Sequence, residues 1–302
     1  MSSMGEERNI SRMRFGMTAG VFTKELSDFE NEIRQLKDIG FDCIDYQGFI
    51  NTQTPLYEMS ETDFETYLQN QRQITESAGI QISQAHGPWR YPICDSTEEE
   101  RNERFEKMSK AIRGTAILGC DRMVLHNIMP QGKVDENASL VKALNRDFFL
   151  RLCEVGRENG VVICLENMPF SGQCLARPWQ TLDFVKSFDS KWFRVCLDTG
   201  HCAVLGISAG DAVRLIGKEY LWALHVHDND GIKDLHRAPC DGVLDWADFG
   251  DALAQIGFEG TLSLETVVPK TLDEEGRQVM LRDLYRQAEQ IANRTWSKKS
   301  LF

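Results

Sequence analysis

The chain has 302 residues, of which 42% are hydrophobic and 26% are charged, a composition typical of a globular protein with a full core. Its formal charge of −12 argues against nucleic acid or an anionic membrane surface as partner, because both favour clustered Lys and Arg. No apolar run approaches the ~20 residues that a transmembrane helix needs, so we expect no membrane span.

Nine cysteines, an odd number without a CxxC pair, favour free thiols over a disulfide framework or a cysteine zinc site. Several stand in apolar, strand-like runs, where a thiol packs as a small hydrophobic group. The N-terminal stretch shows no apolar region typical of a signal peptide. We therefore expect a reducing, cytoplasmic location, and a flexible N-terminal segment over residues 1–12.

Strand-like and helix-like segments alternate throughout the chain. We predict strands over residues 14–21, 41–47, 80–89, 120–127, 161–167, 193–201, 221–230 and 260–266. We predict helices over residues 28–39, 61–78, 97–118, 137–159, 179–188, 209–216, 246–256 and 274–292. Glycines stand at many of the helix-to-strand joints, where a left-handed cap ends a helix: Gly40, Gly79, Gly119, Gly160 and Gly257.

Eight strand–helix units of about 30 to 40 residues predict a parallel sheet, and eight such units close as a (β/α)8 TIM barrel. An open doubly wound sheet is the alternative, but no Gly-rich dinucleotide fingerprint follows the first strand. The chain contains no linker or low-complexity segment, so we predict a single domain over residues 1–302.

Six successive strands carry one ionisable residue at their C-terminal end: His86, His126, Glu166, Asp198, His227 and Glu265. In a barrel all these ends face one mouth, where the active sites of this fold lie. Period-2 alternation places Cys164 and Glu166 on the same inward face. One charged strand end is usually a salt bridge or a solvated rim, but six in phase predict a functional site.

Carboxylates crowded at a barrel mouth repel one another unless a cation neutralises them. Two Glu, one Asp and one His (Glu166, Glu265, Asp198 and His227) form an oxygen-rich set with one imidazole, which suits Mn²⁺, Mg²⁺ or Co²⁺ and also a catalytic Zn²⁺. Such a metal can polarise a substrate carbonyl. A carboxylate beside it can then move a proton on carbon through an ene-diolate.

The segments LEN, LDTGH, HVHDND and LET, in this order and spacing, resemble those of the xylose-isomerase-like TIM barrels. The resemblance covers nearly the whole chain and is closest to sugar phosphate isomerase/epimerase proteins. The superfamily also includes ketose 3-epimerases, inosose dehydratases and the endonuclease IV type of DNA-repair enzyme. It implies a metal-dependent isomerase or epimerase, or a related dehydrating lyase, that acts on a sugar, sugar phosphate or cyclitol. Related barrels are often dimers or tetramers.

The ketose 3-epimerase pattern implies one metal, usually Mn²⁺, with four ligands: Glu166, Asp198, His227 and Glu265. In that family the first and last carboxylates are also the acid/base pair on opposite faces of the substrate. His201 would join Glu166 and Glu265 at the reaction centre by contacting substrate oxygens. The resemblance further implies a set of substrate-binding residues: His86, Trp89, Asn167, His201 and Arg237.

The endonuclease IV pattern fits as well, because that family binds three zinc ions through nine side chains that all have counterparts here. Beyond the four ligands named above, the counterparts are His86, His126, His201, Asp234 and His236. The acidic balance favours the sugar enzyme, and the mouth loops carry only scattered basic residues (Arg90, Lys133, Arg177 and Arg237). A third hypothesis is a sugar-binding barrel that has lost catalysis, against which the intact Glu166 and Glu265 argue.

Three further residues have plain structural interpretations beside the functional ones. His225 stands one layer below His227, and we interpret it as a packed histidine of the barrel interior rather than a ligand. Asp234 and His236 form a D-x-H pair in a loop, where a solvated surface and a second metal site both remain open.

Overall fold

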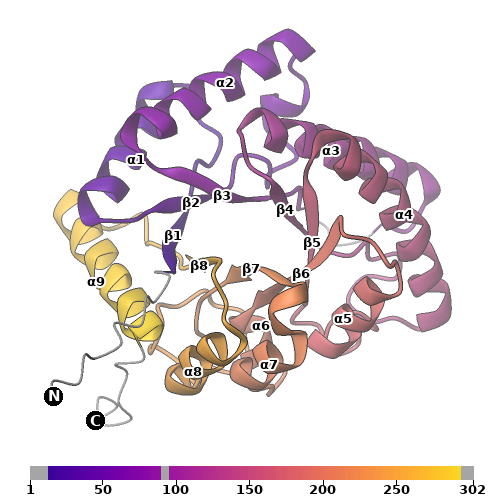
Figure 1. The fold of residues 1–302 in the computed structure, drawn as a ribbon. Coiled ribbons are helices and arrows are strands. Elements are labelled where there is room, and N and C mark those ends of the chain that lie inside the picture. The colour runs from indigo at the N-terminus through magenta and orange to yellow at the C-terminus, as the bar shows by residue number, and fades with distance from the viewer. Residues whose placement is uncertain (1–12, 90–94, 294–302) are drawn as a thin grey trace, which may run out of the picture.

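Eight parallel strands form the centre of the molecule, and helices surround them (Figure 1). The structure is a computed structural model that describes residues 13–89 and 95–293. The strands are β1 (Arg14–Ala19), β2 (Cys43–Tyr46), β3 (Gln81–His86), β4 (Arg122–Leu125), β5 (Val162–Glu166), β6 (Phe193–Asp198), β7 (Leu221–His225) and β8 (Thr261–Leu264). The helices are α1 (Leu26–Ile39), α2 (Glu61–Ala78), α3 (Glu98–Ile117), α4 (Ala138–Asn159), α5 (Pro178–Lys186), α6 (Thr199–Val204), α7 (Ala209–Tyr220), α8 (Trp246–Ile256) and α9 (Glu274–Asn293), with a 3-10 turn η1 (Pro55–Tyr57).

The sheet runs in the order β7-β6-β5-β4-β3-β2-β1-β8. Its two edge strands then meet just beyond the end of β7, where Val226 bridges to Leu264. The amide of Val226 donates to Ser263 O at 2.8 Å, and the amide of Glu265 donates to Val226 O at 3.1 Å. The predicted (β/α)8 barrel is therefore confirmed, and this closure brings the ends of β7 and β8 side by side at the mouth.

The predicted elements are confirmed, but every strand is shorter than predicted, and the sixth and seventh strands show why. We predicted the sixth strand over residues 193–201, yet it ends at Asp198 and α6 begins at Thr199. The physical reason is a cap, because the Asp198 side chain accepts the backbone N–H of His201 at 2.6 Å and turns the chain into a helix. The seventh strand ends at His225, since Val226 leaves β6 and pairs with β8 instead.

Glycine and polar caps set the ends of the outer helices. The five predicted glycine caps all have positive φ, between 64° and 119°, as a left-handed helix end requires. At the other end of α3, Thr97 and Glu100 form a capping box. Residues 1–12, predicted to be flexible, lie outside the described residues, and the single-domain organisation over 1–302 stays a prediction.

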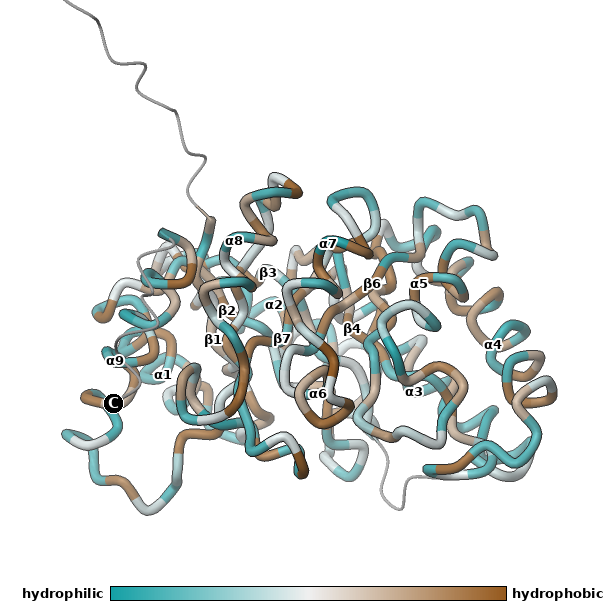
Figure 2. The backbone as a smooth tube through the Cα atoms, turned by 90° about the horizontal axis from the view of Figure 1, so that it is seen from below, coloured by the Kyte–Doolittle hydropathy of each residue, from teal (hydrophilic) through white to brown (hydrophobic). Residues whose placement is uncertain are grey.

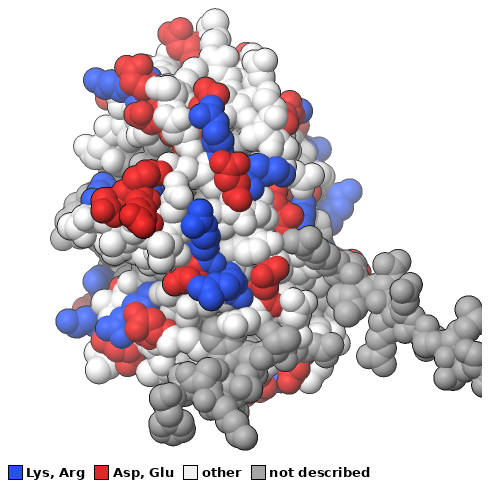
Figure 3. All heavy atoms as spheres, turned by 90° about the vertical axis from the view of Figure 1, so that its left-hand side faces the viewer, with Lys and Arg blue, Asp and Glu red and all other residues white. Residues whose placement is uncertain are grey.

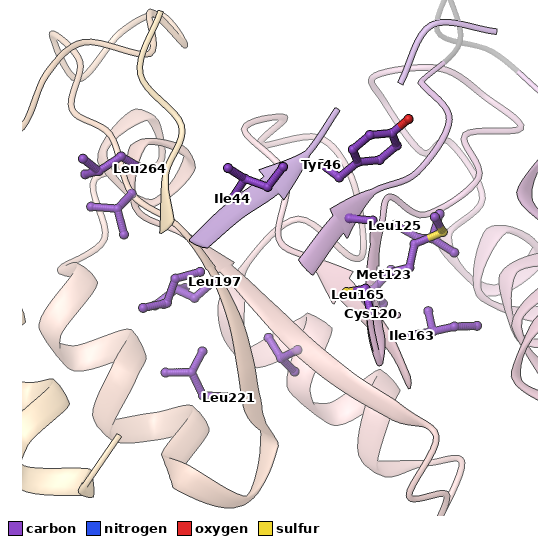
Figure 4. Close-up of a cluster of buried hydrophobic side chains, with 14 of the residues drawn as sticks. Ile44, Tyr46, Cys120, Met123, Leu125, Ile163, Leu165, Leu197, Leu221 and Leu264 are labelled. Carbon is purple, nitrogen blue, oxygen red and sulfur yellow. The ribbon is translucent and has the colours of Figure 1, made fainter. Parts of the chain in front are cut away.

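Alternation along each strand separates two kinds of packing. Outward side chains such as Leu125, Leu165 and Leu197 belong to the large hydrophobic core between strands and helices (Figure 4). Along the outer helices, hydrophobic and hydrophilic residues alternate in the pattern of half-buried helices (Figure 2). The barrel interior holds a separate small cluster that forms the floor beneath the polar mouth: Val124, Val162, Cys164, Cys196 and Ala223.

The outer surface mixes both signs of charge. On the side that carries α1 and α9, Lys and Arg are interspersed with Asp and Glu (Figure 3). Some of these charges pair within one helix, as Arg34 does with Glu30 at 2.9 Å. In the described ranges, no helix is long and apolar enough to cross a bilayer.

We expect Phe193→Ala to lower the free energy of unfolding by about 3–5 kcal/mol, the range for truncating a buried Phe. The Phe193 ring is fully buried and packs on Phe149, Phe184 and Phe188, with centroid distances of 4.7 to 6.2 Å. Urea unfolding followed by circular dichroism measures the change. Leu215→Ala is the control, because Leu215 is 49% exposed on α7, and a similar loss in both variants would contradict the packing argument.

Candidate metal and acid/base site at the barrel mouth

The barrel mouth gathers all six histidines of the sequence around buried carboxylates. The strand ends supply most of these groups, as predicted, and α6 and the loop after β7 supply the rest. His86, Glu166, Asp198 and His225 are the last residues of β3, β5, β6 and β7. His126 and Glu265 directly follow β4 and β8.

Glu166 lies at the centre of this cluster and is fully buried. Its Oε2 atom is 2.9 Å from His126 Nε2 and 3.9 Å from His86 Nε2. Its Oε1 atom is 3.0 Å from His225 Nδ1 and 3.6 Å from His201 Nδ1. Burial alone would raise the pKa of Glu166, but His225 and His126 outweigh it and hold the pKa well below its usual range.

Asp198 and His227 form a second buried pair beside Glu166. Asp198 Oδ2 is 2.9 Å from His227 Nε2, while Asp198 Oδ1 caps α6. Burial raises the pKa of Asp198, but His201 and His227 outweigh it and lower the pKa. Thr199 fixes the backbone of His227 through two hydrogen bonds of its hydroxyl, at 2.7 and 3.0 Å.

His225 is not the simple packing residue that we predicted. It is fully buried, yet its Nδ1 lies 3.0 Å from Glu166 Oε1 and 3.2 Å from Glu265 Oε2. On its other side, Nε2 lies 3.0 Å from Oδ2 of Asp45, which is also fully buried. Burial alone would lower the pKa of His225, but the surrounding anionic groups, Glu166 and Glu265 among them, outweigh it and raise the pKa well above its ordinary value.

Asp45 is the residue that the sequence reading missed. Its Oδ2 also accepts a hydrogen bond from Gln84 at 2.8 Å, and its Oδ1 has no hydrogen-bond partner among the described residues. The signal was present, because Cys43 and Asp45 alternate in β2 as Cys164 and Glu166 do in β5. The last polar residue of a strand marks only the rim of the mouth, whereas Asp45 lies one layer deeper.

Glu265 differs electrostatically from Glu166 although both contact His225. Burial is the largest influence on Glu265 and raises its pKa to about 7, with further upward contributions from Glu166 and Asp198. His225 and His236 act in the opposite direction but do not compensate. The mouth thus holds two glutamates whose pKa values are shifted in opposite directions.

His201, Asp234 and His236 extend the cluster toward solvent. Asp234 Oδ2 is 3.2 Å from His201 Nε2 and 3.4 Å from His236 Nε2, and the His236 ring stacks on His227 at 4.1 Å. Burial would lower the pKa of both histidines, but the neighbouring carboxylates outweigh it and raise the pKa to about 10 for His201 and about 9 for His236. The D-x-H pair therefore lies against the buried cluster and stays partly exposed, and its role as a second metal site remains a prediction.

The donor set fits a divalent cation by composition and spacing. Ligand atoms of Glu166, Asp198, His225 and Glu265 lie within 4.8 Å of one another, and so do those of His227, His236 and Glu265. A third group joins His86 to Glu166 and His225. Glu166 Oε2 is buried without a well-oriented hydrogen bond among the described residues, which leaves it a lone pair for a cation.

The predicted substrate-binding residues divide into two groups. His86 contacts the cluster, and Trp89 packs edge-on against His126 with a centroid distance of 4.5 Å. Asn167 instead holds the backbone of Asp198 through both ends of its amide, at 2.8 and 3.1 Å, so it positions that carboxylate. Arg237 donates to Asp241 O at 3.1 Å within its own loop, and Arg90 lies outside the described residues.

Comparisons with known proteins agree with this barrel. A family model described as xylose isomerase-like TIM barrel matches residues 33–285. Over 186 residues the chain is 30% identical to an uncharacterized protein of Methanocaldococcus jannaschii, covering 58% of this chain and 62% of that protein. It is 22% identical over 273 residues to the D-psicose 3-epimerase of Enterocloster bolteae, covering 87% of this chain and 85% of that enzyme. A crystal structure of D-psicose 3-epimerase in the presence of D-fructose superposes with a TM-score of 0.75 at 19% identity, covering 93% of this chain and 99% of that one.

We expect the Asp234→Asn variant, treated with chelator, to lose less stability than the unsubstituted protein as the pH rises. A histidine whose folded pKa lies above its unfolded value of 6.5 stabilises the fold below pH 6.5, and this stability is lost as pH rises through the folded value. Removing the Asp234 charge lowers both histidine pKa values. Urea unfolding at pH 7 and pH 9.5 should show a loss smaller by about 1–2 kcal/mol than in the unsubstituted protein. Asp251→Asn on the exposed face of α8 is the control, and equal slopes in both variants would contradict the assignment.

We expect Gly200→Ala to weaken divalent metal binding by about 10- to 100-fold, the effect of disturbing the orientation of a ligand. A Cβ atom on Gly200 would overlap the imidazole of His227 and displace it from Asp198. Isothermal titration with Mn²⁺ and Zn²⁺ measures the affinity. Gly206→Ala is the control, because its φ of 66° brings backbone strain while its Cβ would have no neighbour within 4 Å. Unchanged affinity in Gly200→Ala would remove His227 from the metal site.

Proposed function

The chain belongs to the xylose isomerase-like TIM barrel family, and from this premise we propose that it is a metal-dependent sugar isomerase or epimerase. The observation that carries the proposal is the pair Glu166 and Glu265. Both carboxyl groups contact Nδ1 of His225, but their pKa values are shifted in opposite directions. Two carboxyl groups with separated pKa values are the acid/base arrangement that proton transfer on carbon requires.

The protein groups divide the proton transfers between them. Glu166, ionised at neutral pH, accepts the proton from the carbon next to the substrate carbonyl and leaves an ene-diolate of the sugar. Glu265, whose pKa is raised to about 7 mainly by burial, returns a proton to carbon from the opposite face, which inverts the centre. His201 carries a positive charge at neutral pH and stabilises the negative oxygen of the ene-diolate.

A divalent cation, Mn²⁺ by the family pattern, would be held by Glu166, Asp198, His227 and Glu265. When bound, it would supply Lewis-acid polarisation of the carbonyl and acidify the neighbouring C–H bond. His86 suits this environment as a neutral residue, because burial, His126 and His225 lower its pKa to about 4. Asn167 and Thr199 fix the backbones of Asp198 and His227, so the ligands are held in place before a cation binds.

The substrate class that we propose is a small sugar. The D-psicose 3-epimerase relative acts on a ketose of this kind, and the mouth combines polar groups with an apolar wall around Trp89, Met129 and Met168. We also place the protein in a reducing compartment such as the cytoplasm. All eight described cysteines are free thiols, and all but Cys240 are buried.

A second candidate function is a zinc phosphodiesterase of the endonuclease IV type. The observation that favours it is the extension of the site on two sides, with His86 and His126 beside Glu166, and His201 and His236 around Asp234. This arrangement offers ligands for more than one metal. Metal analysis distinguishes the two functions, because one equivalent supports the epimerase and three support the nuclease.

We expect both Glu166→Gln and Glu265→Gln to lower activity at least ~100-fold, the contribution of one general acid or base. The measurement is exchange of a substrate C–H hydrogen in D₂O with added Mn²⁺, over D-psicose, D-fructose, D-tagatose and L-ribulose. Glu259→Gln is the control, since Glu259 is an exposed surface residue paired with Lys218.

Other outcomes would assign a different function. Nicking of abasic DNA without exchange in any sugar would establish the nuclease. Sugar binding by the unsubstituted protein without exchange would indicate a binding barrel. Full exchange in both glutamine variants would contradict the proposed acid/base pair.

A further inference from the structure

Gln47 lies at the C-terminal end of β2, the end of the barrel at which the candidate catalytic residues of the other strands lie. It directly follows β2, as His126 follows β4 and Glu265 follows β8. It continues the inward alternation of Cys43 and Asp45, and its backbone amide donates to Ala19 O at 2.8 Å. Its side chain is buried, with 7% exposure of the residue, and its amide nitrogen has no hydrogen-bond partner among the described residues. A buried donor left free at this level is available for a ligand.

Gln47 shares a cavity with Glu265. The cavity has a volume of 350 Å³, a size typical of small-molecule sites, and lies where α9 packs against β1 and β8 (Figure 1). His236 also lines it, so the cavity borders the candidate reaction centre at two of its residues. Two charged residues, Glu32 of α1 and Arg277 of α9, line it as well. The sequence singled out only two of these lining residues, Glu265 and His236, and it predicted neither as a substrate-binding residue.

The charges of this cavity favour a neutral, hydroxyl-bearing group. The Arg277 guanidinium lies 3.5 Å from Glu32 Oε1, so a carboxylate already offsets its charge. Glu32 is fixed in turn by Gly20, whose backbone N–H donates to Oε2 at 2.9 Å. The second basic group, His236, also lies beside a carboxylate, with its Nδ1 3.7 Å from Glu265 Oε2. A phosphate or carboxylate in the cavity would face Glu32 and Glu265, while each basic group there already has a carboxylate partner. A hydroxyl can accept from the Gln47 amide and donate to Glu32, which satisfies both groups.

We propose that this cavity is the subsite for the hydroxyl-bearing end of the substrate chain, with Gln47 as its specificity-determining donor. The inference rests on the proposed sugar isomerase or epimerase function and deepens it. It assigns the substrate to unphosphorylated polyol chains, because the basic groups of this subsite are already paired with carboxylates and offer a phosphate no further counter-charge.

The test measures the binding and exchange of three probes by Gln47→Met: D-fructose, D-fructose 6-phosphate and the four-carbon ketose erythrulose. Isothermal titration gives the Kd of each probe, and D₂O exchange gives turnover. We expect the Kd of D-fructose to rise about tenfold, the effect of losing one hydrogen bond to a buried donor. The Kd of erythrulose, which has fewer hydroxyl groups to reach the subsite, should rise much less. Gln73→Met, at an exposed position of α2, is the matched control and should change neither.

Each outcome separates the subsite from the proposed function. Equal rises in Kd for the long and short ketoses, or no rise for either, would overturn the subsite and leave the function to the exchange result. Tighter binding of D-fructose 6-phosphate than of D-fructose would overturn the assignment to an uncharged chain. Binding of neither ketose by the unsubstituted protein would also overturn it. Discrimination by Gln47→Met without exchange in any probe would support the subsite and reject the isomerase or epimerase.

Discussion

The structure of the barrel mouth depends on mutual neutralisation of buried carboxylates and imidazoles. Asp45, Glu166 and Asp198 are each at least 99% buried, where an isolated carboxylate would be very unfavourable. His225 contacts the first two, and His227 contacts the third. Removing any partner would leave a charge without compensation in the barrel interior. Neighbouring polar residues hold these groups in place. Gln84 donates to the Asp45 carboxylate, while Asn167 and Thr199 accept from the backbone N–H of Asp198 and His227.

Neutralisation is uneven across the mouth, and this unevenness separates the pKa values of its two glutamates. Glu166 lies among His86, His126, His201 and His225, and stays ionised. Burial raises the pKa of Glu265, and Glu166 and Asp198 raise it further, while His225 and His236 do not compensate. Two glutamates at similar positions, one at the end of β5 and one directly after β8, therefore have different pKa values. The barrel closure between Val226 and Leu264 fixes where Glu265 lies relative to His225.

Below the mouth, the barrel is apolar on both the outer and the inner side of the sheet, and this packing supports the polar strand ends. Outward side chains pack against helices, and the interior below the mouth is filled by Val124, Cys164, Cys196 and their neighbours. Cysteines at these positions are small enough for the centre of the barrel and add no charge. A rigid floor holds the strand ends at fixed spacing, so metal candidates, acid/base candidates and the Gln47 cavity share one framework.

The sequence by itself determined the repeat of eight strand–helix units and the phase of the inward residues. Both are local properties, since periodicity and glycine caps act within a few residues. It also predicted Glu166, Asp198, His227 and Glu265 as one ligand group, because parallel strands of a barrel must end at a common face. In the structure the donor atoms of the three carboxylates lie closest together with His225, while His227 groups with His236 and Glu265. The tertiary structure alone decided how the group is connected. The bridging role of His225, the deeper partner Asp45, and the meeting of Gln47 with Glu265 all arise from contacts between strands far apart in the chain. Such contacts depend on strand register and closure, which periodicity within one strand does not encode.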